Sequence, residues 1–347
     1  MCSAPRLNRE CNVMSEAVMS QPLLAIENLH TSFFTRDGEV QAVRGVSFSV
    51  GAGEIIGIVG ESGCGKSVTC KSVIQLLGGT GRIVGGQIRF RGDDLAGYSP
   101  QALRRLRGND IAMIFQDSMT ALNPVLTVGR QMRDILMRNQ RLDKKTARIR
   151  AIAMLQQVGI AQAEQRYHQY PHEFSGGMRQ RVMIAIALSC HPALLIADEP
   201  TTALDVTIQA QILRLLKQLQ RQTGTAIMLI THDLGVVAQL CSRVVVMYGG
   251  LVMEEGQVED IFYRPAHPYT QGLLASLPRH DAARRRLSPI EGAPPGLLHP
   301  PAGCPFAARC PQRMAVCEQQ QPERRRCGDG HWVQCWLADA GEARYAG

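Results

Sequence analysis

The feature that most constrains the fold is a short glycine-rich segment, Gly60–Ser67. It matches G-x-x-x-x-G-K-[ST], the template of a P-loop, at every fixed position. An apolar run, Ile55–Val59, leads directly into this segment, and Gly65–Leu77 is typical of the helix that follows such a loop. A strand, a P-loop and a helix in this order predict an α/β fold that holds the phosphates of a nucleotide.

The chemistry of a P-loop gives each of its parts a role. Its backbone N–H groups wrap a triphosphate, Lys66 reaches the β- and γ-phosphates, and the Ser67 hydroxyl ligates Mg²⁺. Cys64 is expected to fill space within the loop. The predicted nucleotide-binding residues are the loop and the residue after it: Gly60, Glu61, Ser62, Gly63, Cys64, Gly65, Lys66, Ser67 and Val68.

A second apolar run, Leu194–Ala197, ends at two adjacent carboxylates, Asp198 and Glu199. Such a run is typical of a strand buried in a parallel sheet. Neighbouring carboxylates at a strand end are unfavourable unless a metal neutralises them, so Asp198 is expected to hold Mg²⁺ and Glu199 to polarise an attacking water. His232 follows another buried strand and is predicted to lie beside the γ-phosphate, although a single histidine is more often a structural hydrogen-bonding residue.

Strands and helices alternate along the sequence, which predicts a mainly parallel sheet with helices on both faces. A helical pattern from 127 to 158 places Ile149, Ile152, Leu155 and Val158 at three-residue steps. Further strands are expected at 23–29, 40–50, 87–91, 111–115, 226–230 and 244–247.

The composition is that of a chain with a real core and no membrane span. Hydrophobic residues make up 45% of it, yet no run approaches the about 18–20 apolar residues that cross a bilayer. The N-terminus lacks a basic start followed by an apolar stretch, so we expect no secretory signal and a cytosolic protein that reaches a membrane only through partners. The net charge is +8, and arginine runs at 284–286 and 324–326 indicate a solvated face or linker, or attraction to nucleic acid or an anionic membrane surface.

Three further segments accompany the P-loop, the paired carboxylates and His232, namely Gln116, Phe174–Gln180 and Ala203–Asp205. The ordered set resembles the nucleotide-binding subunits of ABC transporters, and the resemblance covers residues 60–232. In that family the segments are the Walker A loop (Gly60–Ser67), the Q-loop (Gln116), the signature motif (Phe174–Gln180), Walker B (Leu194–Glu199), the D-loop (Ala203–Asp205) and the switch histidine (His232). Phe174 and Met178 stand where Leu and Gln are commonest in the signature motif.

The resemblance implies roles for these residues. Glu199 would be the general base, His232 would position the γ-phosphate, and Gln116 would sense the γ-phosphate and Mg²⁺. The implied Mg²⁺ ligands are Ser67, Gln116 and Asp198. An aromatic residue upstream of the P-loop stacks on the adenine in this family, and the candidates are Phe33 and Phe34.

In the same family the signature motif of one subunit closes on the P-loop of another. The residues implied to act on the second subunit's ATP are Ser175, Gly176, Gly177 and Gln180, while Asp205 communicates across the dimer. The chain is therefore expected to pair with a second ABC ATPase subunit, either itself or a paralogue.

The resemblance extends to the importers of dipeptides and oligopeptides. Phe115–Pro124, His267–Thr270 and the ending from Gly303 to Cys335 are similar to segments of that peptide/nickel branch. This implies two integral-membrane permeases, an extracytoplasmic solute-binding protein, a peripheral position at the cytoplasmic face of the inner membrane, and no nucleic acid. Dipeptides, longer peptides, glutathione-like solutes and nickel chelates all stay open as substrates.

Two other classes of ABC protein fit the sequence less well. Soluble ABC ATPases of translation carry two cassettes in one chain, and those of DNA repair carry long coiled-coil insertions, whereas this sequence has one P-loop and no such insertion. An exporter ATPase is disfavoured by the ending that resembles peptide importers.

These patterns also divide the chain. Residues 1–22 are expected to be a disordered tail, and residues 23–277 the ABC ATPase domain, with a helical subdomain inserted at about 117–190. Residues 278–347 begin with a stretch rich in Pro, Gly, Ala and Arg, and are predicted to be a linker followed by a short cysteine-containing extension.

Five of the eleven cysteines lie in that extension. In a cytosolic chain such a cluster indicates metal or cofactor ligation before disulfides. Zinc prefers pairs two to four residues apart, whereas the C-x5-C-x6-C-x17-C spacing of Cys304, Cys310, Cys317 and Cys335 suits an iron–sulfur cluster better. The family resemblance also implies a [4Fe-4S] cluster on these four, with Cys327 outside the pattern, and the alternative is reduced, unliganded thiols. Because the P-loop is distant in sequence, loss of these cysteines is expected to leave ATP binding intact.

Overall fold

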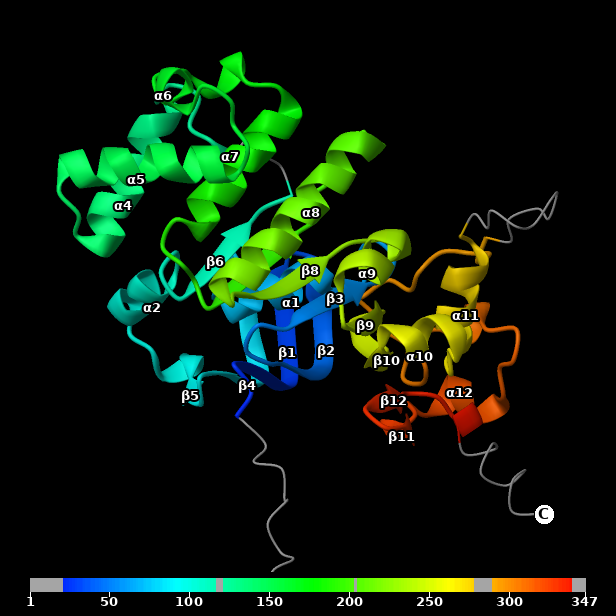
Figure 1. Ribbon diagram of the computed structural model, residues 1–347. Coiled ribbons are helices and arrows are strands. Elements are labelled where there is room, and N and C mark those ends of the chain that lie inside the picture. The colour runs from blue at the N-terminus through cyan, green and yellow to red at the C-terminus, as the bar shows by residue number, and fades with distance from the viewer. Residues whose placement is uncertain (1–20, 117–120, 203–204, 278–288, 339–347) are drawn as a thin grey trace, which may run out of the picture.

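The computed structural model describes residues 21–116, 121–202, 205–277 and 289–338. Its framework is a four-stranded sheet in the order β2-β1-β4-β5 and an eight-stranded sheet in the order β11-β12-β10-β9-β3-β8-β7-β6. Figure 1 shows that helices α4–α7 group on one side of the sheets, whereas the last elements of the chain lie on the other side.

The smaller sheet is antiparallel and comes from the first part of the chain. Its strands are β1 (Leu24–Thr35), β2 (Gly38–Val50), β4 (Gly81–Phe90) and β5 (Asp93–Asp94). The sequence prediction placed the first segments within one mainly parallel sheet, which is wrong for these strands. β1 and β2 are joined by a tight turn and pair as a hairpin, so they form a sheet of their own.

The larger sheet contains the parallel core that the sequence predicts. Strands β6 (Ile111–Ile114), β7 (Leu194–Asp198), β8 (Ala226–Ile230), β3 (Ile55–Val59) and β9 (Arg243–Tyr248) pair in parallel. β10 (Leu251–Gln257), β12 (His331–Val333) and β11 (Arg325–Gly328) then add an antiparallel edge, which the sequence prediction missed. The carboxyl ends of the parallel strands meet at one edge, where ligands bind in open α/β sheets.

The helices follow the strands in chain order. α1 (Lys66–Val73) follows β3, and α4 to α7 all lie between β6 and β7 in the sequence. The helices of the described residues are α1 (Lys66–Val73), α2 (Pro100–Leu106), α4 (Val128–Gln140), α5 (Lys144–Gln157), α6 (Ala163–Arg166), α7 (Gly176–Leu188), α8 (Val206–Thr223), α9 (Leu234–Leu240), α10 (Val258–Tyr263), α11 (Pro268–Ala275) and α12 (Ala315–Gln319), with short 3₁₀ turns η1 (Leu95–Gly97), η2 (Pro171–Glu173) and η3 (Ala307–Arg309).

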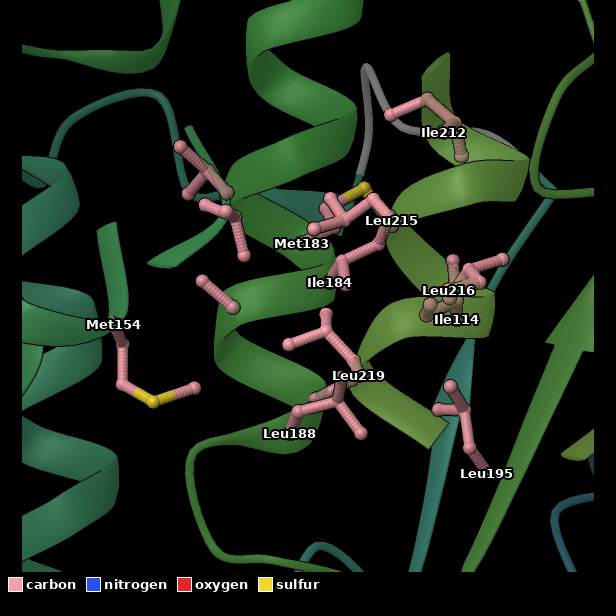
Figure 2. Packing of buried hydrophobic residues seen from close by; sticks show 14 of the residues in the cluster. Ile114, Met154, Met183, Ile184, Leu188, Leu195, Ile212, Leu215, Leu216 and Leu219 are labelled. Atoms are coloured by element: carbon pink, nitrogen blue, oxygen red, sulfur yellow. The ribbon is translucent and has the colours of Figure 1, made fainter. Parts of the chain in front are cut away.

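One apolar core joins the helical group to the larger sheet. Side chains of α7 and α8 point toward one another in Figure 2, with Ile184 and Leu216 both fully buried. The apolar stripe expected along α5 is only partly right, because Ile149 is 61% exposed whereas Leu155 and Val158 are buried. Ala147 and Ala151 occupy the inner face of α5 instead, and these small side chains allow close helix packing.

The last described residues are attached to the larger sheet at several points. β12 pairs with β10, so that Val333 lies opposite Glu254. Arg324 donates to the buried Glu255 over 2.5 Å and stacks on the Trp332 ring. The run at 324–326 is exposed although Arg324 also contacts the sheet, and the run at 284–286 lies outside the described residues.

Candidate ATP-binding site

The P-loop joins the end of β3 to the start of α1 and requires glycine at two points. Gly60 has φ +148°, and a Cβ there would lie 2.1 Å from the Met247 carbonyl oxygen. Gly65 has φ +98°, and its Cβ would lie 2.5 Å from the Ala42 carbonyl oxygen. Both residues therefore hold the loop in a shape that other amino acids cannot adopt.

Positive charge gathers at the start of α1. The buried Lys66 ammonium donates to the backbone oxygens of Gly60 at 2.7 Å and of Glu61 at 2.9 Å. The N-terminus of α1 adds unpaired backbone N–H groups and the positive end of the helix dipole. Together these groups form an anion site suited to phosphates.

Two of the three predicted Mg²⁺ ligands, Ser67 and Asp198, face each other, whereas the third, Gln116, donates to Glu199. The Ser67 hydroxyl donates to Asp198 Oδ1 over 2.9 Å. Asp198 is 3% exposed at the end of β7, and its burial raises the pKa of the carboxyl above the usual value. A hydroxyl and a buried carboxylate are oxygen ligands that Mg²⁺ prefers, so the pair fits the ion.

Three loops bring the predicted catalytic residues onto one carboxylate. Glu199 Oε2 accepts from Gln116 Nε2 at 2.8 Å and from the Thr202 hydroxyl at 2.9 Å, while Oε1 lies 3.3 Å from His232 Nδ1. Burial alone would raise the pKa of Glu199, but the hydrogen bonds from Thr202 and His232 lower it below its usual value. The carboxylate is therefore ionised at neutral pH and able to accept a proton.

Thr202 is a member of this cluster that the sequence analysis missed. It lies three residues after Glu199, where the chain turns at the end of β7 and Thr202 N–H bonds to the Glu199 carbonyl. The backbone of Glu199 is left-handed, with φ +47°, a conformation that is costly for a residue other than glycine. The sequence feature that could have identified Thr202 is a hydroxyl residue three positions after the carboxylate at the end of a strand.

The signature segment lies in a different part of the chain. Ser175 caps α7 by accepting a hydrogen bond from Met178 N–H at 3.4 Å, and it is exposed. A Cβ on Gly177 would lie 2.7 Å from Ile208, so glycine lets α7 approach α8. Gln180 is only 4% exposed, which favours a role within its own chain rather than toward a second subunit. Figure 1 shows α7 beside α4–α6 and apart from α1.

The remaining nucleotide-site predictions have mixed outcomes. Asp205 is exposed and caps α8 through a bond from Ile208 N–H at 2.9 Å, whereas Ala203 and Leu204 lie outside the described residues. Phe33 and Phe34 are neighbours on β1, so their rings face opposite sides of the strand. Phe34 is 45% exposed and is therefore the freer of the two to meet an adenine, which stays a prediction.

The four predicted cluster ligands line one small cavity. Cys304, Cys310, Cys317 and Cys335 surround a space of about 10 Å³, with Phe306 and Trp336 among the apolar walls. Burial raises the pKa of Cys304 to about 12 and that of Cys335 to about 11. Among the described residues, no three His, Cys, Asp or Glu side chains lie close enough to share a single metal ion. Cys327 lies elsewhere, in β11, where its thiol faces the His331 carbonyl.

One more side chain reaches the cysteine cavity. His267 lines it and is almost fully buried. Its Nδ1 accepts from Tyr269 N–H at 2.9 Å, so Nε2 carries the proton, and Nε2 has no hydrogen-bond partner among the described residues. Burial lowers the pKa of His267 to about 4, so the ring is neutral and presents an unused donor.

Comparison with known proteins decides the family. A model described as ABC transporter matches residues 43–202, and one described as the C-terminal region of oligopeptide/dipeptide transporters matches residues 253–317. The dipeptide transport ATP-binding protein DppD of Bacillus subtilis is 56% identical over 320 residues, which cover 92% of this chain and 96% of that protein. The chain belongs to the ATP-binding subunits of dipeptide and oligopeptide ABC transporters. It is accordingly an ATP-hydrolysing subunit.

A further relative and a solved structure support the same family assignment. The oligopeptide transport ATP-binding protein OppD of Escherichia coli is 51% identical over 300 residues, covering 86% of this chain and 89% of that protein. A dimeric ATP-binding cassette, MJ0796, bound to ADP and Pi, superposes with a TM-score of 0.61 at 26% identity, over 68% of this chain and 98% of that one. None of the described helices is long and apolar enough to cross a membrane.

Proposed function

We propose that this ABC subunit drives the import of peptides or similar small solutes by binding and hydrolysing ATP at the cytoplasmic face of the inner membrane. The support is its similarity over nearly the whole chain to subunits named for dipeptide and oligopeptide transport. The main structural support for ATP hydrolysis is that Gln116, Thr202 and His232 all contact the Glu199 carboxylate.

In the proposed mechanism each group has one task. Lys66 and the N–H groups at the start of α1 hold the phosphates, and Ser67 and Asp198 hold Mg²⁺. When bound there, Mg²⁺ neutralises charge on the phosphate oxygens. Glu199 accepts a proton from the attacking water, while His232 and Gln116 orient the γ-phosphate and report its presence.

We further propose that the site is completed by a second ATP-binding subunit. Ser175, Gly176 and Gly177 present a capped helix start at which backbone N–H groups are available to a phosphate. They lie apart from the P-loop of the same chain, so their phosphate belongs to the partner subunit, as in the dimeric cassette that this fold resembles. Two permeases and an extracytoplasmic solute-binding protein complete the proposed transporter.

A reconstitution experiment tests this function. The tagged chain is purified from gently solubilised membranes, its companions are identified, and the complex is placed in liposomes that contain labelled dipeptides or longer peptides. ATP-dependent uptake is expected with wild type, whereas E199Q should bind ATP and transport nothing. Absence of any permease among the companions, or uptake by E199Q equal to wild type, contradicts the proposal.

We also propose that the cysteine cavity accepts a [4Fe-4S] cluster. Four thiols around one space match the Cys₄ ligation of such clusters, and the unpaired Nε2–H of His267 is a donor that a cluster sulfide can accept. A cavity of about 10 Å³ holds at most one water, so the segments that carry these cysteines must move apart to admit a cluster.

Anaerobic purification tests the cluster. Wild type and C327S should contain iron and sulfide and absorb broadly in the visible range, whereas serine at any of the four cavity cysteines should remove both. Freshly reconstituted anaerobic protein without iron contradicts the proposal. Bound zinc would also contradict it, because the cavity would then be a zinc site and not a cluster site.

A further inference from the structure

An arginine of the C-terminal region reaches into the P-loop. Arg309 Nη1 lies 2.7 Å from Glu61 Oε2, and the two residues are 248 positions apart in the sequence. The Arg309 side chain is 7% exposed and that of Glu61 24% exposed, so water screens the ion pair little. Glu61 is the second residue of the P-loop, directly before the turn that wraps the phosphates.

The guanidinium of Arg309 is fixed from several sides. Besides Glu61 it donates to the Tyr248 hydroxyl at 2.9 Å, to the Ile290 carbonyl at 3.0 Å and to the Glu291 carbonyl at 2.8 Å. Burial would lower the pKa of Arg309, but the bonds to Glu61 and Tyr248 raise it above the usual value. A guanidinium with this many partners has little freedom, so its position is set by the surrounding chain.

Glu61 is bonded through its backbone as well as its carboxylate. Its backbone N–H donates to the Tyr269 hydroxyl at 2.9 Å, its carbonyl accepts from Lys66 at 2.9 Å, and its carboxylate is held by Arg309. Two of these partners, Tyr269 and Arg309, come from the region that follows the ATPase motifs. Tyr269 of α11 therefore fixes the backbone of one P-loop residue, and Arg309 of η3 fixes its charge.

From this geometry we infer that Arg309 is a positioning residue for ATP binding, which acts through Glu61. A carboxylate beside the triphosphate repels it unless a cation compensates the charge, and Arg309 supplies that cation. The ion pair also holds the first part of the loop in place before the nucleotide arrives, which lowers the cost of ordering it. The inference depends on ATP binding at the P-loop and not on the identity of the transported solute.

The inference is tested by measuring ATP affinity and steady-state ATPase kinetics of the assembled complex for R309Q. We expect the Kd and KM for ATP to rise about five- to tenfold, with kcat little changed, because a charge contact to the loop is lost while Glu199 is untouched. R309K keeps a cation near Glu61 and should recover part of the affinity. The matched control is R313Q, since Arg313 is an exposed residue of the same segment whose ion pair with Glu318 spans 3.7 Å.

A double-mutant cycle separates this role from general stabilisation. E61Q removes the carboxylate that needs compensation, so R309Q should add little to the Kd of E61Q. If R309Q weakens binding equally in both backgrounds, Arg309 acts through Tyr248 or the 290–291 carbonyls and the inference fails. It also fails if R309Q, folded as judged by its melting temperature, binds ATP like wild type. Where R309Q does not fold, the cycle is measured with R309K, and the inference fails if R309K weakens ATP binding as much in E61Q as in the wild-type chain.

Discussion

Replacing Thr202 with valine removes one hydrogen bond from the proposed base and keeps the shape of the side chain. The hydroxyl donates to Glu199 Oε2 over 2.9 Å, and this bond is among those that lower the Glu199 pKa against the opposing effect of burial. A hydrogen bond to a charged group contributes about 1.5 kcal/mol, and about 1.4 kcal/mol corresponds to one pKa unit. The Glu199 pKa should therefore rise in T202V, because burial then acts against one hydrogen bond fewer.

The sign of the pH effect follows from the role of Glu199. A base works only when ionised, so ATPase activity falls as the pH drops through its pKa, and raising that pKa moves the acid limb to higher pH. The acid side of the kcat–pH profile of the assembled T202V complex should therefore move to higher pH.

A threonine far from Glu199 supplies the control. The Thr223 hydroxyl bonds to the Leu219 carbonyl at 2.9 Å near the end of α8, so T223V changes a similar group without touching the cluster. Its profile should match wild type. An acid limb for T202V that coincides with wild type would refute the view that Thr202 keeps Glu199 ionised.

Two further perturbations address the P-loop and the core. K66A should raise the Kd for ATP by at least about tenfold while leaving the melting temperature near wild type, because it removes the charge that faces the phosphates; equilibrium ATP titration checks this. L216A should cost about 2–5 kcal/mol of unfolding free energy and I149A less than about 1 kcal/mol, since Leu216 is fully buried and Ile149 is 61% exposed. Chemical denaturation of both variants measures the difference, and equal losses would mean that α5 packs on its other face.

The sequence predicts those parts of the fold in which a short run of apolar residues corresponds to a buried strand. β3 and β8 have the expected bounds because all of their residues are buried and apolar. β10 escaped notice because Glu254 and Glu255 are charged, although both are buried. Glu254 accepts from Ala266 N–H at 2.7 Å and from His331 Nε2 at 2.7 Å, 77 residues away, and no local pattern encodes such partners.

Within the site, too, residues of one local motif could be predicted, whereas contacts between distant segments could not. Lys66 and Ser67 sit at fixed spacing inside one motif, so the sequence alone assigned them. The partners of Glu199 come from loops whose meeting depends on the order of β6, β7 and β8 in the sheet, which the motifs imply only through family resemblance. The pair of Arg309 and Glu61 has neither a motif nor a spacing, and only the folded chain brings it together.

The C-terminal region illustrates why distance in sequence was misleading. Loss of its cysteines was expected to leave ATP binding intact, on the ground that the P-loop lies in a separate part of the chain; the two are in fact in contact. Phe306 packs its ring against Tyr248 and Tyr269, with centroids 5.4 and 5.3 Å apart, and Tyr269 in turn binds the backbone of Glu61. Arg309, one residue before the cavity cysteine Cys310, holds the Glu61 carboxylate. A chain cut at residue 277 would keep every ATPase motif and lose the Arg309 partner of the Glu61 carboxylate, so by our inference it should bind ATP more weakly than the whole chain.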